Sequence, residues 1–233
     1  MTNPGLGGLD PDLVRAVMLE AADAAAERTL SGFRTPLAVG NKWETGFDPV
    51  TAADKDAEIA IRAVLSRHFP DHGIIGEEWA DKTSAGSFDW IVDPIDGTRA
   101  FISGVPVWGT LIGLLNGGRA VAGLMAQPFT GETYLGLNGT SIYRRNGEDR
   151  VMRTSGVTEL KHAKVTATSP DIFEQAGTTA NINRLRAAPL QLRWGRDCYG
   201  YCLLAAGPID IVAEYAVKTV AITALSSDLE TPA

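Results

Sequence analysis

Four short apolar segments in the middle of the chain, separated by turn-forming residues, constrain the fold more than any other feature. They span residues 107–115, 120–126, 132–137 and 141–143. The residues between them favour tight turns: Asn116-Gly117-Gly118, Pro128, Gly131 and Asn138-Gly139. Consecutive strands that are joined by such short turns pair antiparallel. The segments are therefore predicted to form an antiparallel meander.

The pattern changes on either side of this meander. Upstream, residues 10–32 and 51–69 are predicted to form two amphipathic helices, because each begins with a capping residue and repeats apolar residues at helical spacing. Downstream, strand-like and helix-like segments alternate. The predicted strands span 164–168, 190–193 and 209–213, and the predicted helices begin at Asp171 and run through 203–206.

These patterns predict one compact unit with two differently built parts. We expect an α+β part over residues 1–150, which carries the candidate site described below, and an α/β part over residues 151–233. A length of 233 residues with 45% hydrophobic residues is enough for a substantial core.

Charge and composition narrow the class of ligand. The formal net charge of -7 argues against a nucleic-acid or membrane-surface binder, because polyanions are held mainly by clustered Lys and Arg. A small ligand is expected instead. No apolar run approaches the roughly 20 residues of a membrane helix, and no signal peptide is recognisable. A cytoplasmic location is therefore expected, where Cys198 and Cys202 stay reduced.

Acidic residues gather after two apolar runs. Residues 90–92 predict a short buried strand that delivers Asp93, and residues 94–97 predict a turn that places Asp96 at the strand's end. A second run, Ile74-Ile75, ends in Gly76-Glu77-Glu78. Three or four carboxylates are expected to converge there.

Carboxylates without His or Cys partners favour a hard cation, and Mg²⁺ is the first choice. The predicted ligands are Glu77, Asp93, Asp96 and the carbonyl oxygen of Ile95. An alternative is a plain solvated turn, since Asp-Gly is also a common tight-turn dipeptide. Asp54 has the similar alternative of a first-turn acid that complements the helix dipole.

The residues after Asp96 suggest a phosphate site. If residues 99–102 begin a helix, backbone N–H groups at Gly97 and Thr98 point into the space beside the metal. The Thr98 hydroxyl is then available to orient a metal-activated water, with Glu77 or Glu78 as proton acceptor. The implied reaction is metal-assisted hydrolysis of a phosphate monoester.

Other phosphate chemistries fit less well. The chain has no Gly-rich loop that ends in Gly-Lys-Ser or Gly-Lys-Thr, and its paired acids are three apart rather than in an Asp-x-Asp pattern. The alternating acids of an EF-hand are also absent from the sequence.

Four segments in order resemble the inositol-monophosphatase family, whose members are lithium-sensitive, Mg²⁺-dependent phosphomonoesterases. They are residues 48–54, 76–78, 93–98 and 206–210. The resemblance implies a layered α-β-α-β-α sandwich, usually dimeric. It also implies that Glu77, Asp93, Asp96 and the Ile95 carbonyl bind metal and that the Gly97 and Thr98 N–H groups hold phosphate. Thr98 is then expected to orient the nucleophilic water, and Asp54 to belong to the outer metal-water network.

Within that family, residues 98–111 and 197–201 resemble the histidinol-phosphate phosphatase branch, which points to histidine biosynthesis. A substrate with an ammonium group calls for carboxylates at the far end of the pocket, and Asp197 and Glu214 are the candidates. Ordinary surface or helix-cap acids are the alternative for both. Inositol phosphate or another small sugar phosphate is the alternative substrate.

One departure from the family pattern concerns the metal. Family members place a further metal-ligating Asp where this chain has Ala221, and the chain stops at Ala233, short of the usual final elements. The resemblance therefore implies a C-terminally truncated sandwich with one retained metal site, weakened Mg²⁺ binding and low turnover. An alternative from another class is a catalytically silent relic that binds a ligand or pairs with a subunit.

Overall fold

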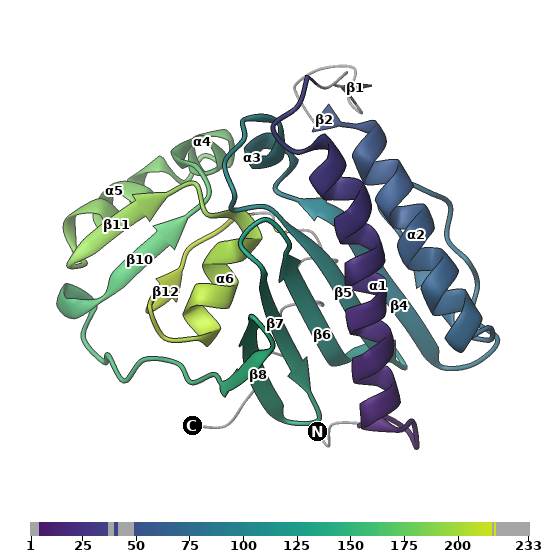
Figure 1. Cartoon of the computed structure of the whole chain (residues 1–233). Helices are drawn as coiled ribbons and strands as arrows, with labels where there is room; N and C mark the ends of the chain where they lie inside the picture. The colour runs from purple at the N-terminus through teal and green to yellow at the C-terminus, as the bar shows by residue number, and fades with distance from the viewer. Residues whose placement is uncertain (1–4, 37–39, 42–48, 216, 218–233) are drawn as a thin grey trace.

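A mixed sheet of seven strands runs through the centre of the molecule (Figure 1). The computed structural model describes residues 5–36, 40–41, 49–215 and 217. The sheet follows chain order: β3 (Gly73–Ile75), β4 (Phe88–Asp96), β5 (Gly109–Asn116), β6 (Arg119–Gln127), β7 (Glu132–Leu137), β8 (Thr140–Arg145) and β9 (Glu148–Val151). β3 pairs parallel with β4, and all later neighbours pair antiparallel.

The predicted meander is thus confirmed, and it is longer by one strand. The sequence pattern does not reveal β9, because all four of its residues are exposed and no apolar alternation marks it.

A smaller sheet contains three parallel strands in the order β11 (Gln191–Trp194), β10 (Lys164–Ala167) and β12 (Ile211–Val212). Helices α4 (Pro170–Gln175) and α5 (Thr179–Ala187) connect β10 to β11, and α6 (Asp197–Ala205) connects β11 to β12. The predicted alternation is confirmed. The pattern does not predict α5, because Ile182 is the single buried residue of this helix.

The remaining described elements are short. They are the antiparallel pair β1 (Gly40–Asn41) and β2 (Pro49–Val50), the single-turn helix α3 (Thr98–Ile102) and the 3-10 turn η1 (Leu160–His162). The large sheet ends at Val151 and the small sheet begins at Lys164, while the division of the chain into two parts at residue 150 stays a prediction.

The two sheets and their helices form five layers, as expected for an α-β-α-β-α sandwich. Helices α1 (Pro11–Gly32) and α2 (Ala52–His68) cover one face of the large sheet, and α6 packs on its other face. The small sheet lies beyond α6, with α4 and α5 on its outer side (Figure 1).

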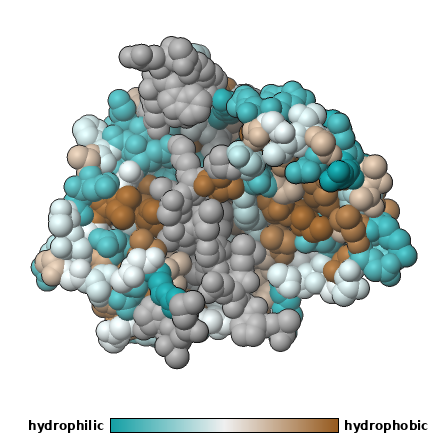
Figure 2. Space-filling model, turned by 180° about the vertical axis from the view of Figure 1, so that it is seen from behind, coloured by the Kyte–Doolittle hydropathy of each residue, from teal (hydrophilic) through white to brown (hydrophobic). Residues whose placement is uncertain are grey.

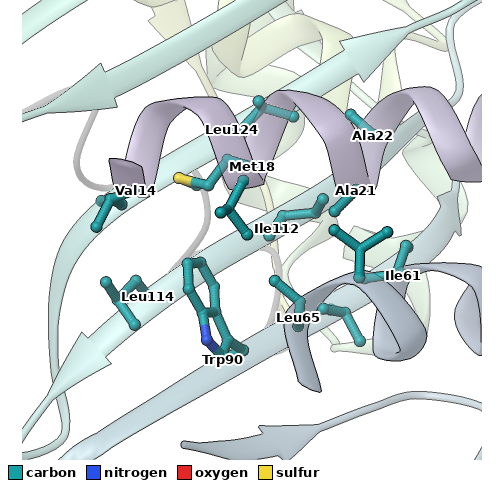
Figure 3. Packing of buried hydrophobic residues seen from close by; sticks show 14 of the residues in the cluster. Val14, Met18, Ala21, Ala22, Ile61, Leu65, Trp90, Ile112, Leu114 and Leu124 are labelled. Carbon is teal, nitrogen blue, oxygen red and sulfur yellow. The ribbon is translucent and has the colours of Figure 1, made fainter. Parts of the chain in front are cut away.

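Helical spacing builds the core between α1, α2 and the large sheet. Figure 3 shows α1 side chains and α2 side chains directed toward the same strands. The buried contacts include Val14, Met18, Ala21, Ile61, Leu65, Trp90, Ile112 and Leu114. Each large apolar side chain buried in this way contributes roughly 1.5–3 kcal/mol. The packing fixes α2 against β4, which carries Asp93 and Asp96 near its end.

The surface mixes polar and apolar residues. Figure 2, which views the molecule from behind, shows two apolar areas within a largely polar surface. Within the described residues, no helix combines the length and apolarity that a membrane span requires.

An imidazole is enclosed by aromatic rings at the edge of the core. His72 stacks on Phe69 at 4.7 Å and on Phe88 at 5.0 Å between ring centroids. Its Nδ1 atom is buried and has no hydrogen-bond partner within the part of the chain that is described. Burial, followed by the charge of Lys82, lowers the pKa of His72 below its usual 6.5.

This environment predicts a loss of stability in mild acid. As the pH falls below about 6.5, the unfolded chain takes up a proton at His72 before the folded chain does, so the free energy of unfolding decreases until the folded pKa is reached. When the pH is lowered from about 7.5 to about 5.5, the Tm of His72→Phe should therefore decrease less than the Tm of the wild type. Scanning calorimetry measures this difference. His162→Asn, at an exposed position, should behave like the wild type, and an equal loss in His72→Phe would contradict the prediction.

Candidate functional site

Strand β4 continues through Pro94 to Asp96, where the sequence pattern predicts a turn. The turn comes at Gly97 instead, whose φ of 85° is left-handed. The ladder tolerates Pro94 because an irregularity in register forms a β-bulge there, and proline has no N–H to donate. Thr110 of β5 stabilises the bulge, since its hydroxyl donates to the Pro94 carbonyl at 2.8 Å.

The bulge brings Asp93 and Asp96 to the same face of the sheet. In a regular strand, residues three apart point to opposite faces. Here Asp93 pairs with Leu111 and Asp96 with Gly109, which are two apart on β5, so the extra residue of β4 removes the difference. That face is the one covered by α6, because Leu111 packs with α6 residues. Asp96 Oδ2 also accepts the N–H of Cys198 in α6 at 3.1 Å.

Parallel pairing places Glu77 next to the end of β4. Ile75, the last residue of β3, pairs with Ile91 of β4. Two residues further along each strand are Glu77 and Asp93. Asp93 is 5% exposed, and its carboxylate accepts the N–H of Ile95 at 3.1 Å. The two predicted ligands therefore emerge at one edge of the sheet.

Glu58 of α2 holds the backbone that follows β3. Its Oε2 accepts the N–H of Glu77 at 3.0 Å and that of Glu78 at 2.7 Å. Its Oε1 accepts from Arg62 Nε at 2.7 Å, and its side chain is completely buried. Sequence reasoning missed Glu58 and Arg62. The available signal was an acid on the apolar face of the predicted helix, four residues after Asp54 and four before an Arg.

Asp54 lies in the first turn of α2 and is 2% exposed. Its Oδ2 accepts from the backbone N–H of Thr51 at 2.8 Å and from the Thr51 hydroxyl at 2.6 Å. These contacts are those of a capping box at the helix N-terminus. Asp54 therefore has a structural role, and its place in a metal-water network stays a prediction.

Thr98 begins α3, the helical turn that follows Gly97. Its hydroxyl donates to the Ile95 carbonyl at 3.0 Å, so its proton is already engaged, whereas the sequence pattern predicts a free hydroxyl. The oxygen of the hydroxyl keeps its capacity to accept a hydrogen bond. The Ile95 carbonyl, the predicted backbone ligand, is thereby directed toward Thr98.

Two acids from the second half of the chain reach the same region. Asp197 begins α6 and packs against Gly97, where an added Cβ would lie 3.1 Å from the Cβ of Asp197. Burial, then the charges of Asp96 and Glu214, raises the pKa of Asp197 to about 7. Burial and the charge of Asp96 also raise the pKa of Glu214, against the effect of two hydrogen bonds from Thr168 at 2.6 and 2.9 Å.

The chemistry of this donor set fits a hard cation such as Mg²⁺. The candidate donors are carboxylates and one backbone carbonyl, and mutual repulsion between Asp96, Asp197 and Glu214 indicates excess negative charge. Within the described ranges, no three His, Cys, Asp or Glu side chains form a group that could hold a metal ion, so the expected convergence of three or four carboxylates is not seen there. Mg²⁺ commonly completes its shell with water and substrate phosphate. Ala221 lies outside the described residues.

The cysteines have a structural position. Cys198 and Cys202 are buried on the side of α6 that faces the large sheet, and no disulfide joins them. The Sγ of Cys198 lies 3.8 Å from the carbonyl oxygen of Asp96. α6 is thus attached to the end of β4 through both the backbone and the side chain of Cys198.

The model of the inositol monophosphatase family matches residues 10–224. This chain belongs to that family. The fold agrees, since an inositol monophosphatase from Zymomonas mobilis superposes with a TM-score of 0.78 at 37% identity, covering 94% of this chain and 83% of that one. The suhB protein of Bartonella henselae superposes with a TM-score of 0.85 at 25% identity, with coverages of 94% and 84%.

Similar curated proteins are phosphatases. The chain is 37% identical to the bifunctional phosphatase IMPL2, chloroplastic, of Arabidopsis thaliana over 97% of this chain and 64% of that protein. It is 36% identical to a histidinol-phosphatase of Chlorobaculum parvum over 88% and 77%. It is also 33% identical to inositol monophosphatase 1 of Solanum lycopersicum over 84% and 72%. The chain therefore spans less than two thirds of the Arabidopsis relative.

Asp197 should make the metal-free protein less stable as the pH rises from about 4 to about 7. Its pKa is about 7 in the folded state against 3.8 for the free side chain, so the folded chain binds more protons between these values. The free energy of unfolding then falls as the pH rises through this window. Asp197→Asn keeps a residue type that tolerates the positive φ of 42°.

We expect Asp197→Asn to match the wild type near pH 4 and to exceed its Tm by several degrees near pH 8, measured by thermal melts with a chelator present. Parallel Tm curves for the two proteins over this range would show that Asp197 is not the responsible group.

Proposed function

We propose that this protein is a Mg²⁺-dependent phosphomonoesterase that converts histidinol phosphate to histidinol and phosphate. The bulge at Pro94 and Ile95 is the observation that carries the proposal, because it turns Asp93 and Asp96 toward the layer that contains Asp197. Metal-ligating acids and substrate-selecting acids then border one space. Membership in a phosphatase family and the similarity to histidinol-phosphatases support it.

In this proposal Glu77, Asp93, Asp96 and the Ile95 carbonyl hold Mg²⁺. When bound, Mg²⁺ neutralises phosphate charge and makes water more acidic. The proposed ligands come from the ends of two neighbouring strands, and the parallel register of β3 and β4 supports their grouping. Asp54 belongs to the outer network of water molecules around the metal.

Thr98 orients the attacking water. Its hydroxyl donates a hydrogen bond to the Ile95 carbonyl, so the Thr98 oxygen can act only as an acceptor toward a water molecule. A water that donates one O–H to Thr98 and the other to Glu77 or Glu78 keeps a lone pair for phosphorus. As that bond forms, the ester P–O bond breaks, and histidinol leaves with the proton that the water gave up. The backbone N–H groups of Gly97 and Thr98 bind the phosphate oxygens.

Asp197 and Glu214 bind the ammonium end of the substrate. Asp197 lies against Gly97 and therefore borders the proposed phosphate position. Burial and charge repulsion raise the pKa of both acids, and a cation there relieves the repulsion. Inositol phosphate is the second candidate, since inositol monophosphatases are similar over comparable lengths. A neutral polyol gains less from two carboxylates than an ammonium group does.

Phosphate release from both substrates tests the proposal. We expect histidinol phosphate to be the better substrate over a series of Mg²⁺ concentrations, measured as kcat/KM. Asp93→Asn should reduce the rate by about 100-fold or more, since even residues behind the metal ligands change activity by roughly 10–100-fold. Asp56→Asn, an exposed acid of α2, is the matched control and should retain the wild-type rate.

Asp197→Asn separates the substrates, because it should raise KM for histidinol phosphate and leave KM for inositol phosphate unchanged. Comparable or faster turnover of inositol phosphate by the wild type would overturn the histidinol assignment.

Ala221→Asp tests the expected loss of a second metal site. If Ala221 occupies the position of a ligand, the variant should reach half-maximal activity at a lower Mg²⁺ concentration than the wild type, because one more carboxylate is available. An unchanged Mg²⁺ requirement would contradict this placement of Ala221. If neither form releases phosphate or binds Mg²⁺ in calorimetry, the alternative of a silent relic replaces the enzyme.

A homodimer and a cytoplasmic location stay predictions.

A further inference from the structure

A single buried carboxylate connects α2 to the segment that carries Glu77. We propose that Glu58 is a positioning residue, which sets the backbone conformation of Glu77 and thereby aims the Glu77 carboxylate at the cation. The inference rests on the proposed role of Glu77 as a Mg²⁺ ligand. Nothing in the proposed chemistry requires Glu58 to contact substrate or metal.

The hydrogen bonds of Glu58 restrict both soft torsions of Glu77. Oε2 accepts the N–H of Glu77 at 3.0 Å and the N–H of Glu78 at 2.7 Å. These N–H groups belong to the two peptide planes that flank the Cα of Glu77, and φ and ψ of that residue describe how the planes are oriented. Holding both planes against one oxygen therefore fixes the direction in which the Glu77 side chain leaves the backbone.

Arg62 keeps Glu58 in place. Its Nε donates to Glu58 Oε1 at 2.7 Å, and its Nη2 donates to the carbonyl of Trp79 at 3.1 Å. The indole N–H of Trp79 donates to the carbonyl of Lys55 in α2 at 3.2 Å. The segment from Glu77 to Trp79 is thus attached to α2 at both ends. A buried carboxylate is tolerated only when it is paired and hydrogen-bonded, and Glu58 meets both conditions.

Gly76 shows how close this approach is. A Cβ at Gly76 would lie 1.9 Å from Glu58 Oε1 and 2.4 Å from Arg62 Nη2. Any side chain there would displace the carboxylate from the two N–H groups. The close approach of Glu58 and Arg62 therefore explains the glycine before Glu77-Glu78. Backbone conformation does not explain it, because the φ of Gly76 is not in the left-handed region.

The competing explanation is that Glu58 only stabilises the contact between α2 and β3. Positioning and stability are separated by Glu58→Gln and Val64→Ala. Glu58→Gln retains shape, loses the ion pair and presents an amide where Arg62 or the N–H groups need an acceptor. Val64→Ala removes a buried side chain from the core face of the same helix without touching the Glu77 segment.

The experiment measures Mg²⁺ affinity by calorimetry and amide exchange by mass spectrometry or NMR on the full chain. We expect Glu58→Gln to weaken Mg²⁺ binding by about 10–100-fold, as is typical for partners that orient metal ligands. Exchange at Glu77 and Glu78 should accelerate while exchange in β4 does not change. Val64→Ala should lower Tm and leave the Mg²⁺ affinity at the wild-type value.

The proposal is wrong if Glu58→Gln binds Mg²⁺ with the wild-type affinity, or if Val64→Ala loses as much Mg²⁺ affinity as Glu58→Gln at a similar Tm. Fast exchange of the Glu77 and Glu78 amides in the wild type would also overturn it, and this measurement needs no variant. If Glu58→Gln does not fold, Arg62→Met replaces it and should show the same changes, and unchanged affinity there overturns the proposal as well.

These readouts do not depend on turnover. A wild type that binds Mg²⁺ but releases no phosphate removes the proposed function and leaves Glu58 to be judged by affinity and exchange. A wild type that binds no Mg²⁺ removes the metal role of Glu77, and the positioning proposal with it.

Discussion

The two acids at the end of β4 share a face because the strand contains one residue more than its partner requires. Without the bulge, Asp93 and Asp96 would point into different layers, since side chains alternate along a strand. The hydroxyl of Thr110 stabilises the irregular stretch by donating to Pro94, and Gly97 then ends the strand in a conformation that suits glycine. The direction of both carboxylates is thus a consequence of how β4 pairs with β5.

Helix α2 supports the site from the opposite layer. Asp54, Glu58 and Arg62 follow one another at intervals of four residues and therefore lie along one side of the helix. Asp54 caps the helix, while Glu58 and Arg62 hold the segment after β3. The apolar side chains next to this row pack on β4, so the same helix that closes the core also holds the Glu77 backbone.

The second half of the chain contributes acids to the space beside Gly97. Asp197 arrives through the attachment of α6 to β4, and Glu214 follows the small sheet at β12. The charges of Asp96, Asp197 and Glu214 oppose one another, and burial increases the energetic cost. A site of this kind is stabilised by cations, which is the physical link between the metal and the cationic substrate in the proposed function.

The resemblance to the inositol-monophosphatase family predicts the layered fold class, and local patterns alone predict both long helices and most strands. Periodicity, capping residues and Gly-rich turns act over a few residues, so these features are visible in the chain itself. Three features became visible in the folded chain: Pro94 lies in a bulge rather than a turn, Thr98 donates to Ile95, and Glu58 accepts the N–H of Glu77. The bulge depends on the register between β4 and β5, and the Glu58 contacts depend on packing between α2 and the segment after β3, so the acid on the apolar face of α2 marks Glu58 without identifying its partner. The Thr98 contact is local, but it forms at the strand end that Gly97 creates.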